Sequence, residues 1–208
     1  VPIVSLDVEG YSRLTQLDEA ATLSAVRHVF TDRVEATIGE YGGSVFKTMG
    51  DGILAQFASA VAAVEWVSGL QQQLYQSPVN SADGKTLQLR AGIVMADVVV
   101  KDDDLLGEGV ILTVRVQGCS PPGGMAISKW MHEYLTGKTD LSFVDIGSQR
   151  LKNIGHTVRV FIWHPDAQLQ QQFANNVLSL VQKGGQPSHR PSVAVLPFEN
   201  FSTDPEQA

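Results

Sequence analysis

Two aspartates stand where the chain is expected to change direction, and together they could hold metal ions. Asp7 ends an apolar, β-branched run at residues 3–8 that predicts a buried strand. Asp51 lies within residues 49–52, between two short apolar runs, and this pattern predicts the tip of a hairpin. Either aspartate alone could simply form a turn. If the first strand lies beside the hairpin, the two carboxylates converge, and hard divalent cations prefer such oxygen ligands. The pair therefore predicts a two-metal site suited to phosphoryl chemistry.

The elements that must position these aspartates follow from the spacing of apolar residues. Strands are expected at residues 3–8, 44–47, 53–57, 87–100, 125–128, 143–149 and 158–163, with a charged loop at residues 101–104. Helices are expected at residues 23–38, 58–75, 109–118 and 129–135. The order is β-α-β-β-α-β with a further α/β extension. It predicts an α+β fold with a ferredoxin-like βαββαβ sheet, antiparallel or mixed, that helices cover.

The 208 residues leave room for one ordinary domain and a tail. We expect the folded domain at residues 1–165 and a helical and linking segment at residues 166–191. Four apolar residues of this segment recur at helical spacing: Leu169, Phe173, Val177 and Leu180. Residues 192–208 predict the start of a further domain that the end of the sequence cuts off.

Charge and cysteine content exclude several classes of partner. A net charge of −7, without any run of Lys and Arg, would repel a phosphate backbone, so we expect no nucleic-acid partner. Glu65 and Asp97 interrupt the longest apolar stretches, and neither stretch reaches the ~20 residues of a membrane span, so we expect no membrane insertion.

The single cysteine, Cys119, permits no internal disulfide and suits a reducing, cytoplasmic setting. The five histidines lack the spacing of metal ligands.

Four motifs, taken in order, resemble those of the class III adenylate and guanylate cyclases. They are LDVEGYS at residues 6–12, GGSVFKTMGDG at residues 42–52, RAGI at residues 90–93 leading into DLLGEGV at residues 104–110, and LKNI at residues 151–154. The resemblance covers about residues 1–165. Residues 192–200 look like the start of the region that follows such domains in bacterial proteins with repeat-containing carboxyl-terminal halves.

The resemblance implies an adenylate cyclase that converts ATP into 3′,5′-cyclic AMP and pyrophosphate in intracellular signalling. In that family the ribose 3′-hydroxyl attacks the α-phosphate with the help of two divalent cations, Mg²⁺ or Mn²⁺. By matching positions, Asp7 and Asp51 hold the cations, and the backbone carbonyl of Val8 adds an oxygen. Two cations about 3.5–4 Å apart can stabilise both the attacking oxygen and the charge that builds on the phosphates.

The resemblance also assigns the nucleotide-binding side chains. Lys47 and Asp104 match the pair that reads the base. Adenine N1 accepts a hydrogen bond and the exocyclic amine donates one, so a lysine and an aspartate complement adenine and mismatch guanine. Arg115 matches the arginine that stabilises charge on the α-phosphate in the transition state. Lys152 matches the lysine that binds the triphosphate.

The family arrangement implies a homodimer with shared active sites. In it two protomers lie antiparallel, the metal aspartates come from one, and the base-reading pair, arginine and lysine come from the other. One chain carries all of these groups, so two copies would form two equivalent sites under twofold symmetry. The expected partners are therefore ATP and a second copy of the chain.

Helix residues before Arg115 depart from the family pattern, mainly at Ile111, and Thr113 and Val114 replace the usual small residues. Ile111 replaces the asparagine that orients the ribose one helical turn before Arg115. Two hypotheses follow: a slow but active enzyme, or a silent cyclase-like module that binds nucleotide or dimerises to regulate the neighbouring region. A polymerase-like palm or a cyclic-dinucleotide synthase is a third alternative, but it gives no role to Lys47 with Asp104 or to residues 151–154.

Overall fold

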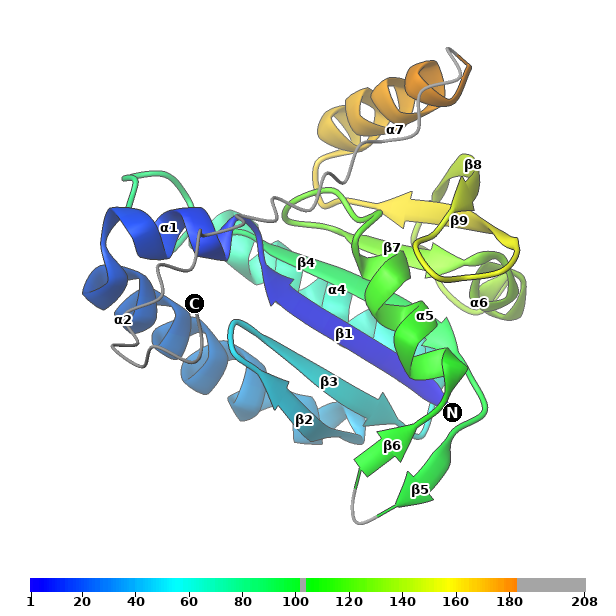
Figure 1. Cartoon of the computed structure of the whole chain (residues 1–208), viewed down its shortest axis with the longest axis horizontal. Coiled ribbons are helices and arrows are strands. Elements are labelled where there is room, and N and C mark those ends of the chain that lie inside the picture. Colours follow the sequence, from blue (N-terminus) through cyan, green and yellow to red (C-terminus); the bar gives the residue numbers. More distant parts are fainter. Residues whose placement is uncertain (102–103, 183–208) are drawn as a thin grey trace, which may run out of the picture.

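A seven-stranded sheet forms the centre of the computed structural model, which describes residues 1–101 and 104–182 (Figure 1). Its strands are β1 Pro2–Val8, β2 Gly43–Met49, β3 Gly52–Phe57, β4 Leu89–Met95, β7 Met125–Ser128, β8 Val144–Arg150 and β9 Thr157–Trp163. Their order is β2-β3-β1-β4-β7-β9-β8, and every neighbouring pair is antiparallel except β4 and β7, which are parallel. The predicted α+β fold with a mixed sheet is confirmed.

Helices cover both faces of this sheet (Figure 1). They are α1 Tyr11–Leu17, α2 Glu19–Val29, a π-helical turn Phe30–Glu35, α3 Ala36–Ile38, a 3₁₀ turn Gly39–Tyr41, α4 Ala60–Gln76, α5 Glu108–Gln117, α6 Lys129–Leu135 and α7 Ala167–Gln182. Residues of α1 to α4 and α6 share one apolar cluster with β1, β3 and β4. Residues of α5 and α7 share a second cluster with β7, β8 and β9. Because both faces are covered, β1 is buried along almost its whole length, and its sequence is a nearly continuous apolar run.

The single long strand predicted at residues 87–100 is wrong. The chain leaves the sheet after Met95 and forms a separate hairpin of β5 Val99–Lys101 and β6 Asp104–Leu106. Of the charged loop predicted at residues 101–104, the two end residues belong to these strands, and residues 102–103 lie outside the described residues. The last residue of β4 paired with β1 is Met95, opposite Pro2, and the Ala96 N–H donates to the Val1 carbonyl at 2.9 Å. The chain then satisfies its backbone groups by pairing with itself.

The predicted helix at residues 23–38 is longer and less regular than its spacing indicated. Asp18 adopts an extended conformation between α1 and α2, and its carboxylate accepts a hydrogen bond from the Ala21 N–H at 2.9 Å. That bond caps α2 and separates it from α1. The other predicted helices and strands lie within a few residues of their expected positions.

The amphipathic helix predicted after residue 165 is α7. Its Phe173, Ala174 and Val177 pack in the second cluster with Ile146 of β8. The linker and the further domain predicted at residues 183–208 lie outside the described residues, and the domain boundary at residue 165 stays a prediction. Among residues 1–101 and 104–182, no helix combines the length and apolar composition that crossing a membrane requires.

Helix α5 lies directly on β4 because Gly92 has no side chain. A Cβ at Gly92 would lie 2.4 Å from the backbone nitrogen of Gln117 and 2.5 Å from its Cα, which is closer than packed atoms approach. The lack of a side chain at Gly92 thus determines how closely α5 can pack against the sheet.

We expect Gly92→Ala to lower the free energy of unfolding by about 1–3 kcal/mol, as overpacking does, because the backbone of α5 must move. Urea denaturation measures the change. Gly69→Ala is the control, since nothing lies within 4 Å of the added methyl group on the exposed face of α4. This control should be up to about 1 kcal/mol more stable than the wild type. Equal stability of Gly92→Ala and wild type would contradict the close packing of α5.

Candidate active site

Backbone pairing brings Asp7 and Asp51 together. Asp7 lies opposite Gly52 in the β1–β3 ladder, and the Val8 N–H donates to the Asp51 carbonyl at 3.2 Å. A Cβ at Gly52 would lie 2.4 Å from the Leu6 carbonyl oxygen, so a glycine is required for this approach. The strand carrying one aspartate is therefore a direct neighbour of the hairpin carrying the other.

The environment of Asp51 disfavours its charge. Burial raises the pKa of this carboxyl above its ordinary value, and the negative charge of Asp7 raises it further. A backbone hydrogen bond and the positive charge of Arg90 oppose these effects without cancelling them. A half-buried carboxylate held beside another one is a typical arrangement for a site that takes up cations.

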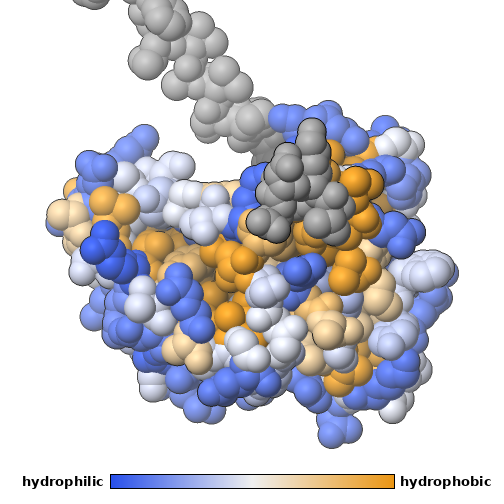
Figure 2. All heavy atoms as spheres, turned by 90° about the horizontal axis from the view of Figure 1, so that it is seen from below, coloured by the Kyte–Doolittle hydropathy of each residue, from blue (hydrophilic) through white to orange (hydrophobic). Residues whose placement is uncertain are grey.

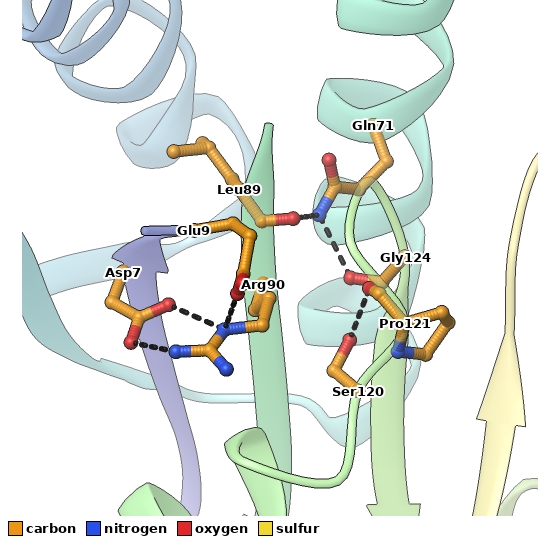
Figure 3. A network of polar contacts seen from close by, with 8 residues as sticks. All are labelled: Asp7, Glu9, Gln71, Leu89, Arg90, Ser120, Pro121 and Gly124. Atoms are coloured by element: carbon orange, nitrogen blue, oxygen red, sulfur yellow. Dashed lines mark hydrogen bonds and ion pairs between the residues drawn. The ribbon is translucent and has the colours of Figure 1, made fainter. Parts of the chain in front are cut away.

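Arg90 is the site residue that the sequence analysis left without a role. It lies directly opposite Asp7 in the β1–β4 ladder. Its Nε donates to Asp7 Oδ1 at 3.1 Å and its Nη2 donates to Asp7 Oδ2 at 2.8 Å (Figure 3). Burial lowers the pKa of Arg90, but Asp7, Glu9 and Asp51 outweigh it and raise the pKa overall. Arg90 is the first residue of the RAGI motif in the sequence. Its partner, Asp7, becomes apparent only from the register of two strands that lie far apart in sequence.

The donor set at Asp7 and Asp51 suits a hard divalent cation. Two carboxylates and the backbone oxygen of Val8 are oxygen ligands, and a Mg²⁺ ion commonly takes one or two carboxylates and completes its shell with water and substrate phosphates. Within the part of the chain that the structure describes, no group of three or more His, Cys, Asp or Glu side chains could hold a metal ion.

Arg115 lies in the last turn of α5, half-buried, one helical turn after Ile111. Its Nε is buried and has no hydrogen-bond partner among the described residues. A buried donor without a partner costs free energy, and such groups are often explained by a missing ligand. Ile111 exposes half of its surface on the same helix.

Lys152 is held beside α5 by its neighbours. Leu151 and Ile154 are buried in the cluster that contains Val116 of α5, and the Ile154 N–H donates to the Leu151 carbonyl at 3.2 Å. Lys152 lies exposed between these two anchors. The LKNI motif thus fixes a lysine next to the helix that carries Arg115.

Lys47 and Asp104 lie on two strands that contact each other, β2 and β6. Lys47 is exposed, and the register of β2 against β3 shifts between Val45 and Lys47, a bulge that re-aims side chains. The backbone of Asp104 belongs to β6, but its side chain lies outside what the structure describes.

The predicted residues form two groups within one copy of the chain. Asp7, Val8 and Asp51 form one group, together with Arg90. Arg115 and Lys152 form the other, and in the described residues neither has a hydrogen bond or ion pair with Asp7 or Asp51.

Comparisons with known proteins point to one kind of enzyme, although no family model matches the sequence. A crystal structure named as an adenylate/guanylate cyclase/hydrolase from Silicibacter pomeroyi is 32% identical, with a TM-score of 0.73, over 79% of this chain and 96% of that chain. An adenylyl cyclase from P. aeruginosa, 19% identical, shares the fold with a TM-score of 0.60 over 80% of this chain and 94% of that chain.

Two curated relatives are longer than this chain. A protein named "Putative adenylate cyclase 3" from Rhizobium meliloti is 38% identical over 205 residues, which are 99% of this chain and 34% of the relative. An uncharacterized protein from Mycobacterium tuberculosis is 26% identical over 163 residues, which are 76% of this chain and 39% of that relative. The chain thus spans little more than a third of the length of the curated relatives it matches.

Asp51→Asn should be more stable than the wild type at pH 7 by a small, measurable amount. The raised pKa of Asp51 means that the folded state holds its proton to a higher pH than the unfolded state, so stability falls as the pH rises from the ordinary value of 3.8 through the raised pKa. The gain should shrink as the pH approaches about 4. Urea denaturation at several pH values measures it.

Asp145→Asn is a control for which the expected change in stability at pH 7 has the opposite sign. The hydrogen bond from Arg159 lowers the pKa of Asp145, so its ionised form stabilises the fold and the substitution should reduce stability at pH 7. An Asp51→Asn protein less stable than the wild type at pH 7 would contradict the electrostatic description of the site.

Proposed function

The chain belongs to the class III adenylate/guanylate cyclase family, and from this premise we propose that it converts ATP into 3′,5′-cyclic AMP and pyrophosphate in intracellular signalling. The observation that carries the proposal is the backbone pairing that holds Asp7 beside Asp51, with Arg90 alongside. Such a pair suits in-line displacement at a phosphorus atom, where catalysis consists mostly of positioning and charge stabilisation.

Asp7, Asp51 and the backbone carbonyl of Val8 would hold two divalent cations, Mg²⁺ or Mn²⁺. When bound, the cations supply Lewis-acid stabilisation of the ribose 3′-oxygen and of the charge on the phosphates. The two aspartates must be ionised to do this, and burial together with the negative charge of Asp7 raises the pKa of Asp51 and disfavours its ionised form. We therefore expect cation uptake to weaken as the pH falls and Asp51 gains its proton.

Lys47 and Asp104 would read the base and favour adenine. The lysine donates to adenine N1, and the aspartate accepts from the exocyclic amine. Guanine offers the opposite pattern at these two atoms, and buried polar groups left without partners discriminate strongly. The contact between β2 and β6 supports this pairing, since the two residues belong to neighbouring strands.

Arg115 and Lys152 would bind the phosphates. The unpartnered Nε of Arg115 supports its role, because a phosphate oxygen would satisfy a donor that residues 1–101 and 104–182 leave without a hydrogen bond. As a preorganised donor to the α-phosphate, Arg115 should contribute about 10² to 10³ in rate. Lys152, anchored beside α5, would add a second positive charge on the triphosphate.

The two halves of the site would meet between two copies of the chain. Figure 2 views the molecule from below, the side on which β2, β5 and β6 lie in Figure 1, and shows apolar surface in the middle of that face with polar surface around it. The exposed large apolar side chains of these strands and of α5 are Val45, Met49, Val99, Leu106 and Ile111. Burying such a face against a second copy would remove apolar surface from water, and a twofold axis would build two equivalent sites.

Ile111 favours a second candidate, a cyclase-like module that is weakly active or silent and regulates the rest of a longer protein. Its apolar side chain lies one turn before Arg115, where the family has an asparagine that orients the ribose. Loose positioning of the sugar is costly, because an error of ~1 Å can reduce the rate about 10²-fold. We favour activity because the groups proposed to bind metal, base and phosphate are all present in the sequence.

Purified protein should release cyclic AMP from ATP with Mn²⁺ or Mg²⁺, Asp51→Ala should abolish the release, and Arg115→Ala should reduce it about 10²- to 10³-fold, to a nearly inactive level. Mixing the two inactive variants should restore about a quarter of the wild-type rate, because half of the dimers are mixed and each has one intact site of two. Chromatography of the products measures the rate. Activity in neither the wild type nor the mixture, with ATP still bound, would favour the silent module.

Ile111→Asn should increase the turnover of ATP by roughly 10-fold or more, because a hydrogen-bonding group again faces the ribose. Ile111→Leu controls for a change of side chain at this position and should leave turnover within about twofold of wild type. Assays with GTP alongside test the proposed base preference. No gain with Ile111→Asn would show that this position does not limit the reaction.

A further inference from the structure

Arg90 lies between two carboxylates, and only one of them has a well-formed hydrogen bond to it. The guanidinium binds both oxygens of Asp7, through Nε at 3.1 Å and Nη2 at 2.8 Å. Its Nε is also only 2.8 Å from Glu9 Oε2, yet this buried oxygen receives no hydrogen bond. Nε carries a single hydrogen, and that hydrogen points at Asp7. Glu9 is therefore ion-paired with Arg90, as the dashed line in Figure 3 marks, but accepts no hydrogen bond from it.

The bonds between Arg90 and Asp7 conflict with the proposed uptake of cations. Both Asp7 oxygens, which would bind a divalent cation, already accept from the guanidinium. A cation arriving at Asp7 would also meet the fixed positive charge of Arg90, and like charges at such distances repel strongly in a partly buried site. Arg90 must therefore give up part of its contact with Asp7 when a cation binds.

Arg90 cannot simply be left without a partner. Its side chain is only 21% exposed, and a largely buried charge that loses its partner is strongly destabilising because water cannot replace that partner. Glu9, whose side chain is 39% exposed, already lies at ion-pair distance, so a small rotation that turns the Nε hydrogen from Asp7 to Glu9 exchanges one acceptor for the other. The number of hydrogen bonds that the Arg90 guanidinium donates to carboxylate oxygens then changes little.

We propose that Glu9 is a positioning residue that takes over the Arg90 guanidinium when Asp7 binds a divalent cation. This inference rests on the proposed function only in that Asp7 binds such a cation. Arg90 keeps Asp7 in place and partly neutralised before the cation arrives, and Glu9 retains Arg90 afterwards. Glu9 thereby strengthens cation binding without being a ligand.

The competing explanation is that Glu9 attracts cations only through its own negative charge. A double-mutant cycle separates the two, because an effect that passes through Arg90 must disappear when Arg90 is replaced. The measured quantity is the Kd of Mn²⁺ for the nucleotide-free protein, from the electron paramagnetic resonance signal of free Mn²⁺ or from calorimetry. Catalytic activity is not needed for this readout.

We expect Glu9→Gln to weaken Mn²⁺ binding about three- to tenfold in the wild-type background, and Arg90→Gln to tighten it. In the Arg90→Gln background, Glu9→Gln should change the Kd less than about twofold. Glu133→Gln, which removes a carboxylate paired with Lys129 on α6, is the matched control and should have no effect. Equal weakening by Glu9→Gln in both backgrounds, or none in the wild type, overturns the proposal.

Two further variants keep the test decisive. If Arg90→Gln does not fold, Arg90→Lys replaces it, because an ammonium group lacks the planar fork and cannot hold both oxygens of Asp7 in the same way. Asp51→Asn identifies the site. Mn²⁺ binding that is insensitive to Asp51→Asn overturns the metal site and the Glu9 proposal together, whereas Asp51-dependent binding with additive Glu9 and Arg90 effects overturns the Glu9 proposal alone.

Discussion

Two carboxylates held close together by backbone pairing are the constraint on which the rest of the structure depends. Asp7 and Asp51 cannot move apart without breaking the β1–β3 ladder, since the Val8 N–H is bonded to the Asp51 carbonyl and Gly52 lies against the Leu6 carbonyl. Their repulsion and the burial of Asp51 oppose folding. The fold tolerates this cost because β1 is central and buried on both faces, and because Arg90 on the opposite strand supplies a positive charge.

The two strands that pair with β1 explain how residues far apart in sequence come together at the candidate site. On one side β3 brings the hairpin tip with Asp51, and on the other β4 brings Arg90. Two residues along β4, Gly92 lets α5 approach the sheet, and α5 carries the arginine that we propose as the phosphate-binding group. Leu89, beside Arg90, is held from the other side: Gln71 of α4 donates from its buried amide to the carbonyls of Leu89 and Gly124 (Figure 3). Strand β4 is thus fixed by helices on both faces, which suits a strand that positions a charged side chain.

Local patterns predicted the fold class, most elements and the meeting of the two aspartates, because each depends on a few consecutive residues and on simple sheet topology. Features that depend on long-range register were missed. The pairing of Arg90 with Asp7 joins residues 83 positions apart, and the strand that ends at Met95 is held in the sheet by pairing with β1, which is equally distant in sequence. The break at Asp18 had a local signal, an N-cap aspartate, that the helical spacing around it obscured. Roles assigned through family motifs, such as the phosphate-binding role that we propose for Arg115, rest on the resemblance, and the unpartnered Nε of Arg115 supports this one.

The most direct test of this account is a crystal structure of the protein with Mn²⁺ and an ATP analogue that cannot cyclise, with Mn²⁺ located by its anomalous scattering. The account predicts Mn²⁺ against Asp7 and Asp51 of one copy, and an adenine nucleotide that also contacts Arg115 and Lys152 of the second copy. Mn²⁺ bound away from the two aspartates, or a nucleotide bound entirely within one copy, would contradict it.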